Sequence, residues 1–229
     1  MMDDMSSTSD GEYAKYWTEW FLYLRGNEYF VEVDEEYIAD RFNLTGLNQE
    51  VDHYVPALQL ISDELDESRL DEHTREAVDR SARHLYGLIH ARYVLTTRGM
   101  HKILDKYKGL GFGRCPRVLC NSQPLLPVGL SDIPGRHSVK LYCCHCEDVY
   151  NPKSTRHATI DGAYFGTSLP HMIFQMFPTL VPEKSIVRYE PKIFGFKLHA
   201  TADLHRKQDK IRDQQAKRLV AAGIEPPAL

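Results

Sequence analysis

The chain has 229 residues, of which 42% are hydrophobic, so it can bury a core and is not disordered throughout. Its formal net charge of -4 argues against a general nucleic-acid-binding protein, because such proteins usually carry a clear basic excess. No stretch is apolar enough to span a membrane, and the N-terminus lacks the basic and apolar regions of a secretory signal. We therefore expect a cytoplasmic and nuclear chain whose thiols stay reduced.

Residues 1–12 are polar and acidic and are expected to be disordered, because they offer no apolar face to bury. Ser7 and Ser9 in this segment are each followed three positions later by an acidic residue. That spacing suits an acid-directed kinase, so both serines are candidate phosphorylation sites.

Residues 13–108 carry apolar side chains at the spacing of helix faces, which predicts an α-helical domain. We expect helices over residues 17–24, 34–42, 51–61, 78–93 and 97–108. Asp34 and Thr97 are the predicted N-caps of the second and the last of these helices. Gly26 and Gly109 are the predicted stops of the first and the last.

An acidic stretch lies between the third and fourth predicted helices, at Asp63, Glu64, Asp66, Glu67, Asp71 and Glu72. Such a run is most often a solvated loop. Its alternative role is electrostatic, since it would attract polycations or damp the charge of a basic partner.

The sequence changes character at residue 109, because glycine, proline and cysteine crowd together and short β-type runs appear at 139–142 and 148–150. These features predict a small antiparallel β module over 109–167. A short amphipathic helix is expected at 171–177, in a segment over 168–203 that also contains the apolar run 193–198. The predicted fold class is therefore α+β, with a helical domain, a β module and an extended C-terminal arm.

A charged tail follows over 204–229 and contains the basic residues Arg206, Lys207, Lys210, Arg212, Lys217 and Arg218. These side chains could contact nucleic acid, but Asp209 and Asp213 interrupt them. The pattern favours a solvated helix.

All five cysteines lie between Cys115 and Cys146, and four of them form the pairs Cys115-x4-Cys120 and Cys143-x2-Cys146. A zinc ion takes four tetrahedral ligands, and two thiolates on one short turn can reach the same ion. Two disulfides are the alternative, which a chain without a secretory signal disfavours. Four sulfur ligands leave no open coordination position, so we expect one structural Zn²⁺ per chain.

Two further residues, Cys144 and His145, lie inside the second pair. Cys144 could replace Cys143 as a ligand, but Cys-x-Cys closes a tighter loop than Cys-x2-Cys. The spacing therefore favours Cys144 as a thiol outside the metal site. His145 is expected to be a solvent-facing turn residue.

No set of residues points to a catalytic site. The glycines at 109–113 resemble a phosphate-binding loop, but they follow a predicted helix rather than a strand and have no lysine or acidic partner at the required distance. The sequence contains no nucleophile elbow at 129–131, no His-Glu-x-x-His helix and no kinase catalytic motif. We therefore expect a non-catalytic chain.

Several long runs resemble the regulatory (beta) subunit family of casein kinase II, a Ser/Thr kinase directed to acidic sites. The matching runs lie at 24–28, 40–47, 85–93, 115–118, 129–135 and 161–166, within a resemblance that covers roughly residues 17–200. The resemblance implies a homodimer that forms through the zinc module and binds two catalytic alpha subunits in a heterotetramer. Such a subunit stabilises the catalytic subunit and modulates its choice of protein substrates.

Carried over by position, the resemblance implies that the zinc ligands are Cys115, Cys120, Cys143 and Cys146. It implies that the dimer contact contains Pro116, Val118, Val149 and Tyr150. It also implies that Phe194 and Phe196 insert into a groove on the catalytic subunit, where buried aromatic side chains commonly carry most of the affinity. Ordinary core packing is the alternative for these two residues.

Two other functions are open at this point. One alternative is a general interaction scaffold or a zinc-ribbon nucleic-acid-binding protein, and the latter would place a basic, aromatic face on the module. The cysteine pairs are instead flanked by Glu147 and Asp148 as well as by Arg114 and Arg117. A zinc enzyme would need an open metal position.

Overall fold

The computed structural model describes residues 16–66, 68, 70–182, 192–197 and 203–224. The predictions made for residues 1–12, including Ser7 and Ser9, lie outside these residues, and so does the prediction for Glu67. Among the described helices, none is both long and apolar enough to cross a membrane.

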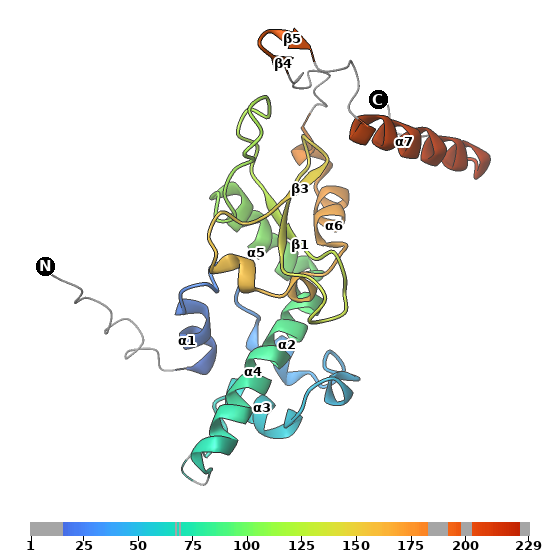
Figure 1. Cartoon of the computed structure of the whole chain (residues 1–229). Helices are drawn as coiled ribbons and strands as arrows, with labels where there is room; N and C mark the ends of the chain where they lie inside the picture. The colour runs from blue at the N-terminus through green and yellow to red at the C-terminus, as the bar shows by residue number, and fades with distance from the viewer. Residues whose placement is uncertain (1–15, 67, 69, 183–191, 198–202, 225–229) are drawn as a thin grey trace, which may run out of the picture.

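The first half of the chain is helical (Figure 1). Its α-helices are α1 (Trp17–Tyr23), α2 (Glu35–Ala39), α3 (Tyr54–Ile61), α4 (Glu72–Tyr93) and α5 (Thr97–Lys108), and the 3-10 helix η1 (Leu47–Gln49) lies between α2 and α3. The longest helix is α4, which packs against α3 and buries the face that carries Leu85 and Ile89. Its N-cap is Asp71, whose carboxylate accepts a hydrogen bond from the Thr74 backbone N–H.

Several predicted helix boundaries are wrong: α3 begins at Tyr54 rather than at residue 51, and α4 begins at Glu72, six residues before the predicted start. The helix that begins after Asp34 ends at Ala39 rather than Phe42, because residues 40–46 form turns whose carbonyls at Asn43 and Thr45 accept hydrogen bonds from Arg92 at 2.8 and 2.9 Å. Asp34 makes no capping hydrogen bond either, since its carboxylate pairs with Lys102 at 2.7 Å.

The N-cap of α5 is Thr96, one residue earlier than predicted. Its hydroxyl accepts a hydrogen bond from the Gly99 backbone N–H at 3.1 Å. Both Thr96 and Thr97 are good capping residues, so local preference alone did not separate them.

The second half contains a small antiparallel sheet in the order β1-β2-β3. Its strands are β1 (Leu126–Val128), β2 (Lys140–Cys143) and β3 (Asp148–Tyr150), and Leu126 pairs with Tyr142 while Tyr142 pairs with Val149. Strand β1 was not predicted, because Pro127 interrupts an already short apolar run. The mixture of helices and a small antiparallel sheet is confirmed.

The helix α6 (Leu169–Met176) packs against β1, and the 3-10 helices η3 (His157–Thr159), η4 (Gly162–Tyr164) and η5 (Pro178–Leu180) connect this part of the chain. At the C-terminal end, β4 (Lys192–Ile193) and β5 (Phe196–Lys197) form a hairpin, and α7 (Asp203–Ala221) follows. Figure 1 shows the hairpin and α7 at the same end of the molecule, beyond α6.

One core joins the helices to the β module. The imidazole of His90 lies between Phe30 and Phe165, with ring centroids 4.9 and 5.1 Å away. Gly87 allows the ring of Tyr164 to approach α4, since a Cβ at residue 87 would lie 2.5 Å from that ring. This packing orients the sheet, and with it the cysteines, relative to the helices.

Candidate metal centre and exposed apolar surfaces

The second cysteine pair lies on the turn that joins β2 to β3. Cys143 is the last residue of β2, and the turn closes through Glu147, whose backbone φ of 52° is left-handed. The Cys146 backbone N–H points back at the Cys143 sulfur at 3.4 Å. The two-residue spacing therefore folds both sulfurs to the same side.

The first pair lies on a loop closed by a bridge between Arg114 and Pro124. The Cys115 N–H donates to the Gln123 carbonyl at 2.8 Å, and the Cys120 N–H donates to the Arg117 carbonyl at 3.0 Å. These backbone bonds turn Cys120 back towards Cys115.

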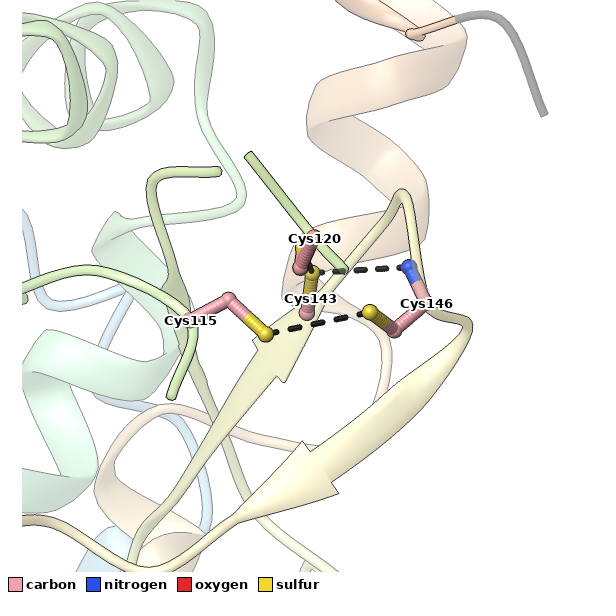
Figure 2. Close-up of side chains that lie close together, drawn as sticks. All are labelled: Cys115, Cys120, Cys143 and Cys146. Atoms are coloured by element: carbon pink, nitrogen blue, oxygen red, sulfur yellow. Dashed lines mark hydrogen bonds between the residues drawn. The ribbon is translucent and has the colours of Figure 1, made fainter. Parts of the chain in front are cut away.

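The two turns bring all four sulfur atoms within 4.8 Å of one another. Figure 2 shows the side chains converging from the loop and from the β2–β3 turn. The Cys115 and Cys146 sulfurs are 3.8 Å apart, and the Cys120 and Cys143 sulfurs are 3.4 Å apart. Four sulfurs bound tetrahedrally at about 2.3 Å from a zinc ion lie about 3.8 Å from one another, so the cluster is close to the size that a bound ion requires.

Burial strongly raises the pKa values of two of the four thiols. Three of the cysteines are buried and Cys146 is half-buried. Burial raises the pKa of the Cys120 thiol to about 12 and raises the pKa of Cys143 far above its usual value. A divalent cation would supply the positive charge that favours thiolates here.

Cys144 lies outside the cluster. Its sulfur is 3.6 Å from the Gln123 side-chain nitrogen and 4.0 Å from the Tyr107 hydroxyl, while Gln123 also donates to that hydroxyl at 2.8 Å. The polar group around Cys144 was not predicted, because no local pattern links these positions. His145 does not face solvent as predicted, since it is half-buried and its Nδ1 is shielded from water.

The residues expected at a dimer contact lie beside the cysteine cluster. The side chains of Val118 and Val149 are 86% and 41% exposed, Pro116 is exposed and Tyr150 is half-buried. Arg117 donates to the Asp148 carboxylate at 2.7 Å, which ties the loop of Val118 to the strand of Val149. The cysteine module therefore presents apolar side chains to solvent on two neighbouring segments.

Phe194 lies at the turn of the β4–β5 hairpin and is 96% exposed. Both turn residues have positive φ, 49° at Phe194 and 86° at Gly195, as in a two-residue hairpin turn. Phe196 follows in β5, paired with Ile193, and its side chain lies outside the described part of the structure. Phe194 is thus not core packing within this chain.

The acidic loop follows α3. Asp63 accepts a hydrogen bond from the Trp17 backbone N–H at 2.9 Å, and Asp66 accepts one from the Ser68 backbone N–H. Glu64 is exposed. Part of the predicted solvated stretch therefore has a structural role, because Asp63 fixes the start of α1.

Comparisons with known proteins agree on one family. The family described as casein kinase II regulatory subunit matches residues 16–197. Casein kinase II subunit beta-2 of Neurospora crassa is 58% identical over 98% of this chain and 78% of its own length. Casein kinase II subunit beta of Schizosaccharomyces pombe is 60% identical over 96% of this chain and 95% of its own length. Casein kinase II subunit beta' of Saccharomyces cerevisiae is 51% identical over 98% of this chain and 88% of its own length.

Proposed function

This chain belongs to the casein kinase II regulatory subunit family, and from that premise we propose that it is a non-catalytic subunit of the kinase. It dimerises through a zinc-bearing module and binds catalytic alpha subunits in a heterotetramer. In that assembly it stabilises the catalytic subunit and modulates substrate choice, in the cytoplasm and nucleus.

The observation that carries the proposal is the four-sulfur cluster. Its sulfurs lie within 4.8 Å of one another, and Cys115, Cys120, Cys143 and Cys146 would bind one structural Zn²⁺. Such an ion is worth about 10–16 kcal/mol of folding free energy in small zinc modules. It would hold the loop and the β2–β3 turn together, which a three-stranded sheet of short strands cannot do alone.

The exposed apolar side chains beside this centre support the dimer. Exposure of the apolar side chains of Val118 and Val149 to water is unfavourable, and burying them against a second copy would stabilise the dimer. Tyr150 and Pro116 would complete this contact. A twofold contact uses the same patch on both copies, so these residues would pack against their own counterparts.

Phe194 supports binding of the catalytic subunit. A hairpin turn holds the Phe194 ring in water, where the ring contributes nothing to folding. An aromatic side chain that enters a partner's pocket is a typical anchor of an interface. Phe196 is proposed as the second anchor.

Native mass spectrometry of the purified chain, alone and with a casein kinase II catalytic subunit, tests the proposal. The expected species are a dimer with two zinc ions and a complex that adds two catalytic chains. Phe194→Ala combined with Phe196→Ala should remove the catalytic chains and leave the zinc-bearing dimer. Phe42→Ala is the matched control, because Phe42 is 82% exposed in the turns after α2.

Two results would contradict the proposal. A zinc-bearing dimer that ignores the catalytic subunit would reject the kinase role while leaving the metal centre in place. Kinase activity of the chain alone would reject its non-catalytic role.

A further inference from the structure

The tail helix α7 gathers four basic residues on one face, although the sequence intersperses basic and acidic residues. At 3.6 residues per turn, Lys207, Lys210, Lys217 and Arg218 fall along one line of the helix, and only the neutral Gln214 lies among them. All four side chains are exposed. We call these four residues the basic stripe.

The acidic residue Asp209 lies on the other side of α7, whereas the exposed Asp213 borders the basic stripe, three residues after Lys210 and four before Lys217. Asp209, Arg212, Ala216 and Leu219 are half-buried and recur at the spacing of one helix face, roughly opposite the basic stripe. Arg212 donates to the Glu147 carboxylate at 2.9 Å, on the β2–β3 turn that carries the second cysteine pair. This ion pair joins α7 to the cysteine module on the side of the helix opposite the basic stripe.

No ion pair joins the basic stripe to another residue in the part of the chain that the structure describes. Four positive charges along one line, bordered by the carboxylate of Asp213, leave a net positive face that favours an anionic partner. The stripe spans about 16 Å from Lys207 to Arg218, at about 1.5 Å per helical residue. An extended acidic segment of about five residues, at about 3.3 Å each, would cover it.

We propose that the basic stripe docks acidic segments of the proteins that the catalytic subunit phosphorylates. This inference rests on the function proposed above, because the hairpin that carries Phe194 is the proposed contact with the catalytic subunit. Helix α7 begins six residues after β5 ends, at the same end of the molecule (Figure 1). An acidic segment on the basic stripe would therefore be held near the bound kinase, which raises its local concentration.

An acidic protein segment fits the stripe better than nucleic acid does. Helix α7 contains no Phe, Tyr or Trp, the larger aromatic side chains on which an unpaired base stacks best. The whole chain carries a net charge of -4, which opposes long-range attraction of a nucleic acid backbone.

A direct binding measurement tests the stripe without the kinase. The probe is a fluorescein-labelled peptide of ten glutamates, and its binding to the full-length chain is followed by fluorescence anisotropy at two salt concentrations. Replacing the four stripe residues with glutamine should raise the Kd at least five-fold at low salt and flatten its salt dependence. Glutamine preserves helix propensity, so the helix content of the variant should be unchanged.

The matched control removes the same charge elsewhere. Arg80, Lys108, Arg136 and Lys153 are exposed and lie outside α7, so their combined replacement with glutamine changes the net charge equally. This control should leave the Kd within two-fold of wild type. An equal loss in both variants, or no loss in the stripe variant, would overturn the inference.

Kinetics of the complex with the catalytic subunit give the second test. The stripe variant should raise KM for a long acidic protein substrate at least three-fold, with kcat unchanged. KM for a short peptide that reaches only the active site should not change. Tighter, stripe-dependent binding of single-stranded or duplex oligonucleotides than of the glutamate peptide would show that nucleic acid is the ligand and would reject the proposal.

The two proposals fail separately. Stripe-dependent peptide binding by a chain that does not bind the catalytic subunit would reject the kinase role alone. A complete complex whose stripe variant binds the peptide as wild type does would reject the docking role alone.

Discussion

At the scale of single residues, His90 links segments that are far apart in the chain. It is fully buried, its Nε2 accepts from the Val31 N–H at 3.1 Å, and its Nδ1 lies 2.8 Å from the Tyr164 carbonyl oxygen. These partners require a neutral ring with the proton on Nδ1. Burial lowers the pKa of His90 from 6.5 to about 4, which agrees with a neutral imidazole at physiological pH.

His90 should therefore make stability depend on pH. The unfolded chain protonates this imidazole below pH 6.5, whereas the folded chain does so only near pH 4. The contribution of the neutral His90 to the free energy of unfolding is fully present above pH 6.5. It decreases by about 3 kcal/mol as the pH falls to about 4. Urea unfolding of wild type and His90→Gln at several pH values checks this, since effects on carboxylates and metal ligands cancel in the difference. A difference between the two proteins that stays constant from pH 7 to pH 4 would contradict it.

Gly87 is a second residue whose identity is set by packing. An alanine would favour the helix by about 1 kcal/mol, but its Cβ would lie 2.5 Å from the Tyr164 ring, and the ring would have to move. We expect Gly87→Ala to lower the free energy of unfolding by about 1–2 kcal/mol, measured by denaturant titration. In a Tyr164→Ala background the same change should be neutral or stabilising, because the clash is gone.

At the scale of elements, α5 depends on its first turn. The Thr96 hydroxyl accepts the Gly99 N–H at 3.1 Å, and the Lys102 and Lys106 side chains of this helix donate to carbonyls in the segment before α2. The helix therefore anchors that segment as well as itself. Fraying of the first turn of α5 would weaken both.

We expect Thr96→Ala to cost about 1 kcal/mol of stability, since one N–H at the start of the helix loses its acceptor. Thermal unfolding measures this loss. Thr96→Ser keeps the oxygen and should recover most of the stability. If Thr97→Ala were the more damaging change, the cap would be at the residue that sequence preference suggested.

At the scale of the whole molecule, the four-cysteine cluster is continuous with the core. Cys115, Cys120 and Cys143 belong to the same buried cluster as the residues of α4 and α5. Loss of a bound ion would leave three buried thiols without their cation, at the point where the loop and the β2–β3 turn meet. The effect should therefore spread beyond the sheet.

A zinc chelator should lower the melting temperature and dissociate the proposed dimer, because about 10–16 kcal/mol of metal binding exceeds the net stability of most domains. Cys143→Ser should reproduce the loss. Cys144→Ser should keep one zinc ion per chain, measured by native mass spectrometry, because its sulfur faces Gln123 and Tyr107. Loss of zinc in Cys144→Ser but not in Cys143→Ser would reverse the ligand assignment.

Several features were predictable because they depend on neighbours in the sequence. The periodic apolar residues that include Leu85 and Ile89 predicted α4, and the short spacing of Cys143 and Cys146 predicted a metal-binding turn. The end of α2 was missed, because it depends on Arg92, some 49 residues from Asn43. The domain boundaries and the dimer and kinase contacts stay predictions.

The sequence by itself determined the family, the helical first half and the four cysteines, since these rest on short spacings and on residue identities. Only the tertiary structure decided that Cys144 faces Tyr107, that Gly87 must admit Tyr164, and that α7 is joined to the cysteine module on the side opposite its basic stripe. Each of these depends on contacts between residues dozens of positions apart. Such contacts follow from how the elements pack, and periodicity along one segment does not encode them.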